Sequence, residues 1–377
     1  MLLAALLASA AALPGIEPQS PSDLQAILAL SIDPGFDDQW NHTNPDHGLH
    51  LSSIGEVVRG QAFQVCVFMT GHAAGPNGRV DSTYDIEITR PDGTTYLQKH
   101  EVELRRGEKI GAGSVLRANT LLGLAFSPTD PLGRYTVRIE VHDRIGGRSA
   151  QTKEPLTLTA NPEPRPFKDR ESLHAWELSY YRVPTPLRLL DALGDAGALG
   201  LGGSTAADHE LRRFLCVLLD DNTFLVPLLL ERFPKLDHAG RLAALSLLAG
   251  SGLDAQPFLS AAAEEERRQY EPLHAQQRPD PLHGPIRDAV QVDELWGLFF
   301  ASGRYAPIER LARALTLDEE LDGGPKQAGT QALEEAVRAS LRRNLRLPRV
   351  RPYCEWMLAN GRVGEDDTAE LTKLLEE

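Results

Sequence analysis

Apolar and polar residues alternate along much of the first half of the chain, most clearly in the stretch 130–143. Pro131 and Gly133 predict a turn, and a strand pattern follows at once. The apolar positions of this pattern are Tyr135, Val137, Ile139 and Val141. A period of two puts one apolar face on a core and one polar face, with Arg138 and Glu140, in water. The stretch therefore predicts a late strand of an antiparallel sheet.

Turn signals and short apolar runs recur from residue 54 to residue 159. Pro91-Asp92-Gly93 is one turn, because Pro presets φ and Gly supplies a positive φ, and Pro76-Asn77-Gly78 is another. The expected strands are 56–59, 62–69, 83–89, 95–102, 121–126, 135–141 and 149–158. About seven short strands with regular turns are typical of an immunoglobulin-like β-sandwich. Residues 22–32 are open to two interpretations, a short helix or an edge strand.

The second half of the chain has helical spacing instead. Apolar residues recur three and four positions apart, and Gly303 and Gly361 follow two of these segments, where a left-handed helix end favours glycine. The expected helices are 208–219, 239–248, 292–301, 308–315, 328–345 and 368–375. The pattern predicts an irregular all-α domain of helical hairpins.

These patterns define a multidomain chain in which β structure precedes α structure. The expected parts are a signal peptide over 1–12, an N-terminal extension and polar loop over 13–53, an immunoglobulin-like β-sandwich over 54–160, a Pro-rich linker over 161–166 and an all-helical domain over 167–377. Because alternating prolines make the linker stiff and extended, we expect the two domains to fold separately.

Two groups of residues resemble known proteins. Gly133 and Tyr135 resemble the Gly-x-Tyr entry to a late strand in immunoglobulin-like and macroglobulin-like bacterial modules. The resemblance implies that the Tyr135 hydroxyl bonds to the backbone across the corner, although Val137 stands where antibody domains have their second cysteine. The helical segment with Trp296, Phe299, Phe300 and Gly303 resembles an element of uncharacterised bacterial secreted proteins that join a β-sandwich to helices. That resemblance implies no activity, and its aromatic residues are expected to pack in the core.

The first twelve residues bear on localisation. They form an apolar run that ends in small residues, and Ala8-Ser9-Ala10 fits a signal-peptidase site, although a positively charged start is missing. We expect a periplasmic or secreted protein, with a cytoplasmic protein as the alternative. The run is too short to span a bilayer, and no later segment is long and apolar enough.

The net charge and the cysteine content bear on nucleic-acid binding, metal binding and disulfide formation. The net charge of −14 argues against general nucleic-acid binding, which needs a basic surface. The three cysteines, Cys66, Cys216 and Cys354, have no metal-binding spacing. Buried free thiols are the favoured interpretation, and a bridge between Cys216 and Cys354 remains open.

A polar cluster at 37–50 offers candidate metal ligands. His42, His47 and His50 lie among aspartates, and imidazole and carboxylate groups together can bind Zn²⁺. However, Pro45 and Gly48 predict a loop with no helix to fix the geometry. A solvated loop is therefore the favoured interpretation, and we predict no metal and no cofactor.

One helix carries a local excess of positive charge. Arg338, Arg342 and Arg346 are four residues apart and so share a face. Neighbouring arginines that add to this basic patch are Arg343, Arg349 and Arg351. The patch is a candidate for binding a partner, such as an anionic lipid, a glycan or an acidic protein. An ordinary amphipathic helix explains the same pattern.

The sequence contains no catalytic motif, neither Gly-x-Ser-x-Gly nor His-Glu-x-x-His. We therefore predict a non-catalytic extracytoplasmic protein that binds or scaffolds another protein or an envelope component. Capture of a partner by an exposed sheet edge is a special case of this function. The alternative is an enzyme whose site lies at the domain interface, with the His42, His47 and His50 loop as one wall. In one version of this alternative the enzyme is metal-dependent through that loop.

Overall fold

The computed structural model describes residues 23–44, 47–111, 114–160, 164–201, 209–275, 280–284, 286–317 and 330–377. The chain divides into two compact units. The sheet unit comprises residues 1–32 and 48–163, and the helical unit comprises residues 33–47 and 164–377. The expected order of β structure followed by α structure is confirmed. The expected signal peptide and residues 161–163 of the expected linker lie outside the described residues.

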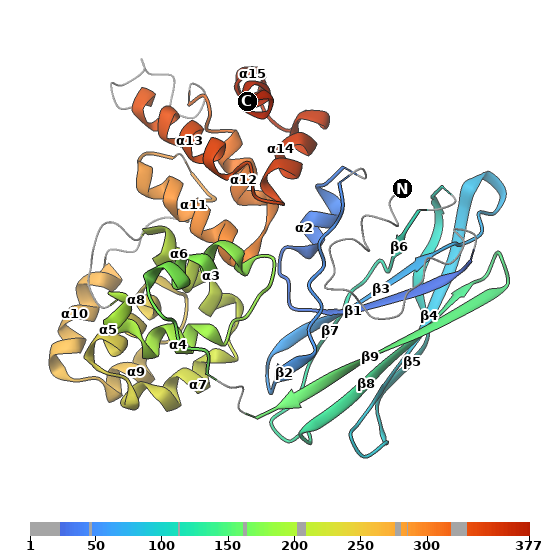
Figure 1. The fold of residues 1–377 in the computed structure, drawn as a ribbon, viewed down its shortest axis with the longest axis horizontal. Helices are drawn as coiled ribbons and strands as arrows, with labels where there is room; N and C mark the ends of the chain where they lie inside the picture. The colour runs from blue at the N-terminus through green and yellow to red at the C-terminus, as the bar shows by residue number, and fades with distance from the viewer. Residues whose placement is uncertain are drawn as a thin grey trace. The chain divides into compact units, whose positions relative to one another are not determined.

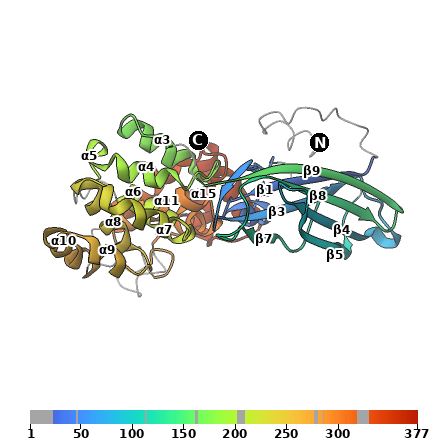
Figure 2. The same cartoon turned by 90° about the horizontal axis from the view of Figure 1, so that it is seen from below.

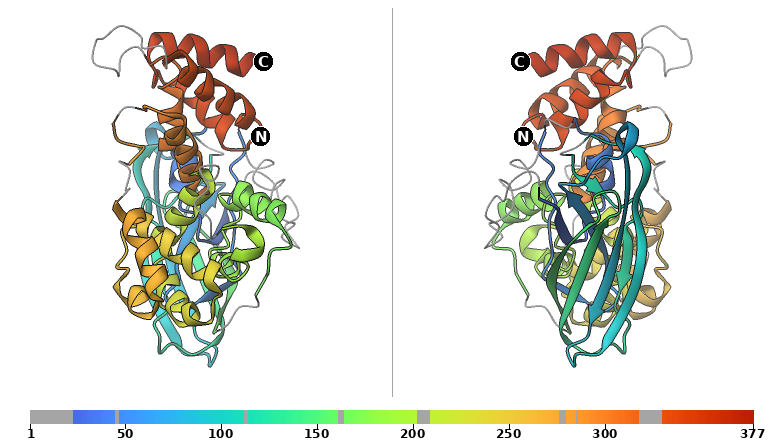
Figure 3. Two further views of the ribbon diagram at one scale, coloured as in Figure 1. Left: turned by 90° about the vertical axis from the view of Figure 1, so that its left-hand side faces the viewer. Right: turned by 90° about the vertical axis from the view of Figure 1, so that its right-hand side faces the viewer.

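The sheet unit contains two sheets (Figures 1 and 2). The strands are β1 (Gln25–Ser31), β2 (Glu56–Val58), β3 (Ala62–Thr70), β4 (Arg79–Thr89), β5 (Thr95–Lys109), β6 (Leu116–Arg117), β7 (Leu122–Ala125), β8 (Gly133–Asp143) and β9 (Arg148–Thr159), with a 3₁₀ turn η1 at Pro76–Gly78. One sheet has the order β1-β3-β6, and β7 also pairs with β3. The other has the order β2-β9-β8-β4-β5, in which only β2 and β9 run parallel. This five-stranded sheet curls into an open half-barrel (Figure 3).

Alternate residues of both sheets share one hydrophobic core. The strand predicted at 135–141 is β8, and its apolar positions are all fully buried. Arg138, between them, is exposed. The Tyr135 hydroxyl donates a hydrogen bond to the Pro131 carbonyl oxygen at 2.8 Å, as the Gly-x-Tyr resemblance implied. The predicted register of this strand is therefore confirmed.

The expected extension over 13–53 does not form one part of the structure. Gln25–Ser31 is an edge strand that pairs antiparallel with β3. The next residues, 33–47, belong to the helical unit and contain the short helix α2 (Phe36–Asn41). An apolar run as short as β1 cannot be assigned to strand or helix by periodicity alone, so its pairing partner decides. The helical domain expected over 167–377 is thus completed by an earlier segment of the chain.

The helical unit is a set of packed helices around one core. Besides α2 they are α3 (Arg170–Tyr180), α4 (Arg188–Gly194), α5 (Ala196–Leu199), α6 (His209–Asp221), α7 (Leu225–Arg232), α8 (His238–Gly250), α9 (Gln256–Ala261), α10 (Glu264–Ala275), α11 (Ala289–Ser302), α12 (Tyr305–Ala312), α13 (Thr330–Asn344), α14 (Val350–Ala359) and α15 (Glu365–Glu376), with a 3₁₀ turn η2 at Phe233–Lys235. All six expected helices are present, with ends shifted by a few residues. Trp296, Phe299 and Phe300 of α11 are buried in the core as expected. Gly303 and Gly361 have φ values of 61° and 58°, in the left-handed region expected after a helix.

The structure also bears on the cysteines and on membrane-spanning helices. Cys66, Cys216 and Cys354 are all buried and form no disulfide bond, which confirms the favoured interpretation. Among the described residues, no helix has the length and apolar character to cross a membrane.

Candidate functional site

A histidine and two glutamates come together between α3 and α6. His174 and Glu177 are three residues apart on α3, and Glu210 lies in the first turn of α6. One ligand atom from each residue can be chosen so that all three atoms lie within 4.8 Å of one another. His174 Nδ1 is 3.0 Å from Glu177 Oε2. We call these three residues the His-Glu-Glu cluster.

The start of α3 is fixed by a capping box. The Asp169 side chain accepts a hydrogen bond from the Ser172 backbone N–H at 2.8 Å, and Ser172 Oγ accepts one from the Asp169 N–H at 3.2 Å. Such a cap satisfies two of the unpaired donors at a helix start. Trp176 and Tyr180 bury one face of the helix. Together the cap and the buried face set the direction in which His174 and Glu177 project.

The position of Glu210 depends on close packing between α6 and α11. A Cβ atom on Gly297 would lie 2.3 Å from the Glu210 carbonyl oxygen and 2.9 Å from the Phe214 backbone nitrogen. Contacts this short do not occur in real structures, and backbone atoms cannot move aside as a side chain can. The absence of a side chain at position 297 therefore permits α11 to approach α6 closely beside Glu210.

The variant Gly297→Ala is expected to lower the free energy of unfolding of the helical unit by about 1–3 kcal/mol, because the added methyl group overpacks the crossing of α6 and α11. A matched control is Gly194→Ala at the end of α4, where an added Cβ meets nothing within 4 Å. Alanine is the better helix former, so the control should be unchanged or more stable by up to about 1 kcal/mol. Chemical denaturation followed by circular dichroism measures both. Equal effects would contradict the close helix approach.

Burial and charge change the acidity of the cluster. Burial, together with the nearby carboxylates of Glu177 and Asp293, raises the pKa of Glu210 to about 7, and Arg343 opposes the rise. The hydrogen bond to Glu177 raises the pKa of His174. Glu177 is itself buried, with 2% of its side chain exposed. The arrangement can therefore hold a proton between two carboxylates or bind a cation.

The histidines predicted from sequence make other contacts. The His42 ring stacks on Tyr305 with centroids 4.0 Å apart and meets the edge of Trp356 at 4.7 Å. His47 Nε2 is 2.5 Å from a Glu355 carboxylate oxygen. Both belong to the helical unit, where α2 lies against α12 and α14 (Figure 1), whereas His50 belongs to the sheet unit. That these histidines bind no metal stays a prediction.

Two arginines of the basic patch pair with carboxylates near the C-terminal end of the chain. Arg338 Nε is 3.0 Å from Glu370, and Arg342 Nε is 2.5 Å from Glu377. Arg346 is exposed. Arg349, expected to add to the patch, is instead buried, because it forms an ion pair with Asp33. Two of the three candidate partner-binding arginines thus pair with Glu370 of α15 and with Glu377, the residue after it. Figure 3 shows α13 and α15 in orange and red at the C-terminal end.

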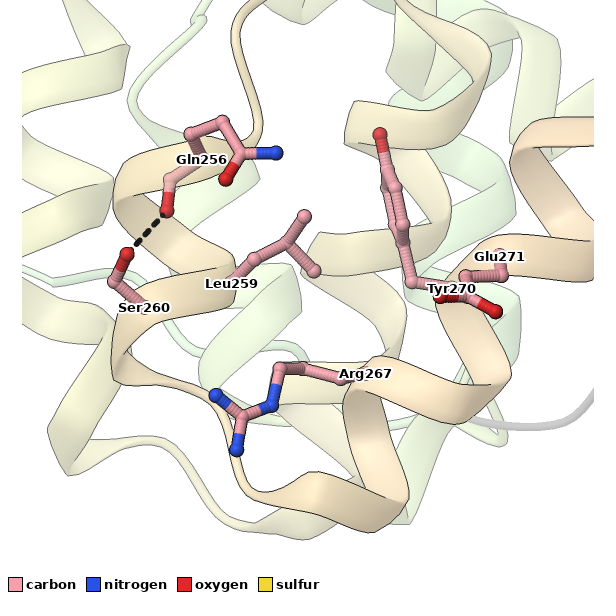
Figure 4. Close-up of a pocket in the computed structure, with 6 residues that line it drawn as sticks. All are labelled: Gln256, Leu259, Ser260, Arg267, Tyr270 and Glu271. Atoms are coloured by element: carbon pink, nitrogen blue, oxygen red, sulfur yellow. Dashed lines mark hydrogen bonds between the residues drawn. The ribbon is translucent and has the colours of Figure 1, made fainter.

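A small hollow lies between α9 and α10 (Figure 4). Its lining residues are Gln256, Leu259, Ser260, Arg267, Tyr270 and Glu271. Its volume is about 220 Å³, below the range of about 300–1,000 Å³ typical of sites that enclose small molecules. Its residues also lack a group of converging titratable side chains, so the hollow does not define a site.

Sequence reasoning missed the His-Glu-Glu cluster. The available signal was the i, i+3 spacing of His174 and Glu177, which puts both on one helix face. That spacing could not be used because no helix was expected over α3. Glu210 is in an expected helix, but the approach of α6 to α3 is a tertiary feature.

Comparisons with known proteins give generic likenesses. No family model and no curated protein matches the chain. Among solved structures, an immunoglobulin-like protein from Pseudomonas aeruginosa is 12% identical, with 37% of this chain and 100% of that chain covered and a TM-score of 0.19. The sporulation control protein Spo0M from Bacillus subtilis is 12% identical over 37% of this chain and 50% of that chain, with a TM-score of 0.23. A Salmonella alpha-2-macroglobulin mutant is 13% identical over 95% of this chain and 26% of that chain, with a TM-score of 0.19. Such low values support no statement about function.

Proposed function

We propose that the protein is a periplasmic or secreted binding or scaffold protein without catalytic activity. We also propose that its sheet unit is an immunoglobulin-like or macroglobulin-like β-sandwich. The hydrogen bond from Tyr135 to the Pro131 carbonyl supports this finer assignment, because it matches the tyrosine corner of such folds. The fold alone does not specify a function.

One observation carries the proposal of a scaffold role. The polar side chains most suggestive of chemistry in the sequence join separate segments of the helical unit. His42 packs on Tyr305 and Trp356, His47 pairs with Glu355, and Arg338 pairs with Glu370. These contacts support a framework role for these side chains.

The exposed end of the basic patch is the favoured surface for a partner. Arg346 is exposed, and an acidic protein or an anionic envelope component would complement its charge. Capture by the edge strand β5 is less favoured. That strand carries Lys99, Glu101 and Glu103 and pairs irregularly with β4, and charges and bulges are features that discourage strand addition.

The localisation is tested by expressing the full chain in a Gram-negative bacterium, fractionating the cells and sequencing the mature N-terminus. We expect the protein in the periplasm or medium with its first residues removed. A cytoplasmic protein that keeps Met1 would contradict the proposal.

Binding is tested with the purified full-length protein and a bacterial envelope fraction in a sedimentation assay. We expect Arg346→Glu to reduce the sedimented fraction, because it reverses a charge at the proposed surface. Arg287→Glu, which reverses another exposed arginine of the helical unit, is the matched control and should bind as wild type does. Equal binding by all three proteins, or no binding at all, would reject this surface.

A further inference from the structure

We propose that His174, Glu177 and Glu210 form a binding site for a divalent transition metal of the zinc class. This inference goes beyond the proposed binding or scaffold role and does not depend on it.

The geometry of the His-Glu-Glu cluster fits such an ion. With metal–ligand bonds of about 2.0 Å, ligand atoms around tetrahedral zinc lie about 3.3 Å apart. His174 Nδ1 and Glu177 Oε2 are 3.0 Å apart, and the ligand atoms of all three residues lie within 4.8 Å of one another. Binding of the ion would therefore require the Glu210 carboxylate to move closer to the other two ligands.

The surroundings of Glu177 can be compared with those of Glu266, another buried glutamate of the helical unit. Glu266 is fully buried and contacts a histidine too, since His238 Nδ1 lies 2.9 Å from its Oε1. Its third partner, however, is a cation, because Arg241 Nε donates to the same oxygen at 2.8 Å. At Glu177 the ligand atoms within 4.8 Å of one another include the carboxylate of Glu210. A cation between Glu177 and Glu210 would further reduce their repulsion, which the charge of Arg343 already opposes at Glu210.

The donor set indicates the class of metal. Imidazole nitrogen with carboxylate oxygen suits Zn²⁺ and neighbouring transition metals, whereas Mg²⁺ and Ca²⁺ prefer oxygen ligands alone. Three protein ligands leave a fourth tetrahedral position for water. The His174 side chain is 56% exposed, which gives the ion a path from solvent. Because the ligands come from α3 and α6, a bound ion would join these helices.

The test uses the full-length protein, which is first treated with a chelator and then freed of the chelator. Calorimetric titration with Zn²⁺ is expected to show one site per chain, and Zn²⁺ should raise the melting temperature of the helical unit. Mg²⁺ and Ca²⁺ at the same concentration should do neither. Absence of a Zn²⁺-dependent rise in melting temperature in the wild-type protein would overturn the proposal, whatever the variants do.

Variants then locate the site. His174→Gln and Glu210→Gln each remove one ligand at a side chain that is at least partly exposed, and each should weaken Zn²⁺ binding by more than about 100-fold, since even outer-sphere changes cost 10–100-fold. The matched control is His283→Gln. His283 Nδ1 lies 3.1 Å from Asp280 Oδ2 with the same i, i+3 spacing, but this pair belongs to no group of three ligands among the described residues. The Zn²⁺ affinity of His283→Gln should equal that of the wild-type protein.

Other results would reject the site. Equal Zn²⁺ affinity in His174→Gln, Glu210→Gln and wild type would place binding elsewhere. Loss of binding in His142→Gln would assign it to the outer face of the sheet unit, where His142 and His100 flank Asp85. These outcomes are separate from the localisation and envelope-binding results, so failure of one proposal leaves the other testable.

Discussion

Asp33→Asn is expected to lower the free energy of unfolding of the helical unit by about 3–5 kcal/mol, the cost of removing one partner from a buried ion pair. Arg349 is 1% exposed, and both of its terminal nitrogens bond to the Asp33 carboxylate, with Nη1 3.1 Å from Oδ1. The amide introduced by this substitution is neutral, so the Arg349 charge would remain buried without its counter-ion. The Asp33 carboxylate also accepts a hydrogen bond from the Gly35 N–H at 2.9 Å, which shapes the entry to α2.

The matched control for this prediction is Asp37→Asn. Asp37 is exposed on α2, so the same chemical change should cost within about 0.5 kcal/mol. Thermal unfolding followed by far-ultraviolet circular dichroism compares the two variants through the helical signal. Similar small losses would mean that residues 33–47 do not contribute to the core of the helical unit.

The ion pair also revises the expectation that the two domains fold separately on either side of the linker. The helical unit includes residues 33–47, which the chain supplies between β1 and β2. A fragment that begins at the linker would lack Asp33 and would also lose Asp38, whose carboxylate accepts a hydrogen bond from the Tyr305 backbone N–H at the start of α12. The linker is therefore not the only boundary between the two units.

Ile139→Ala is expected to lower the free energy of unfolding of the sheet unit by about 2–5 kcal/mol, the range for emptying a core site. Ile139 is fully buried in the core shared by the two sheets. It lies on β8, with β4 on one side and β9 on the other. Neighbouring strands on both sides limit how far the structure can relax into the cavity.

Arg138→Ala tests the face of the same strand. Arg138 is exposed and has Nε 3.4 Å from Glu87, a surface ion pair of little energetic weight. Its loss should cost about 0.5 kcal/mol or less. Thermal melts of the two variants, read at the transition of the sheet unit, give the comparison. A larger loss for Arg138→Ala than for Ile139→Ala would show that the register of β8 is inverted.

The local patterns of the sequence predicted much of the secondary structure. Alternation identified β8 and its buried face, and three- and four-residue spacing identified α6, α8, α11 and α13 within a few residues of their ends. The aromatic residues of α11 were assigned to the core for the same reason. These features depend on residues close in sequence, and periodicity reports directly which side of an element is apolar.

The candidate site depended on contacts that periodicity does not report. A helical or strand pattern shows that a face is buried but does not show which other element covers it. Glu210 joins His174 and Glu177 through the packing of α6 among its neighbours, and Gly297 permits α11 to approach α6 closely beside Glu210. Within the helical sequence a single glycine has many interpretations, so this approach was not predictable.

By itself, the sequence determined the order of β structure followed by α structure, the turns and strand faces of the sheet unit, and the apolar faces of the main helices. The tertiary structure decided that β1 is part of a sheet, that residues 33–47 complete the helical unit, and that Arg349 is buried rather than part of a basic patch. Asp33 and Arg349 are 316 positions apart. Residues so distant share no local pattern, and the charge of each, read alone, predicts exposure to solvent. Only their meeting makes burial of both favourable, and that meeting is a property of the folded chain.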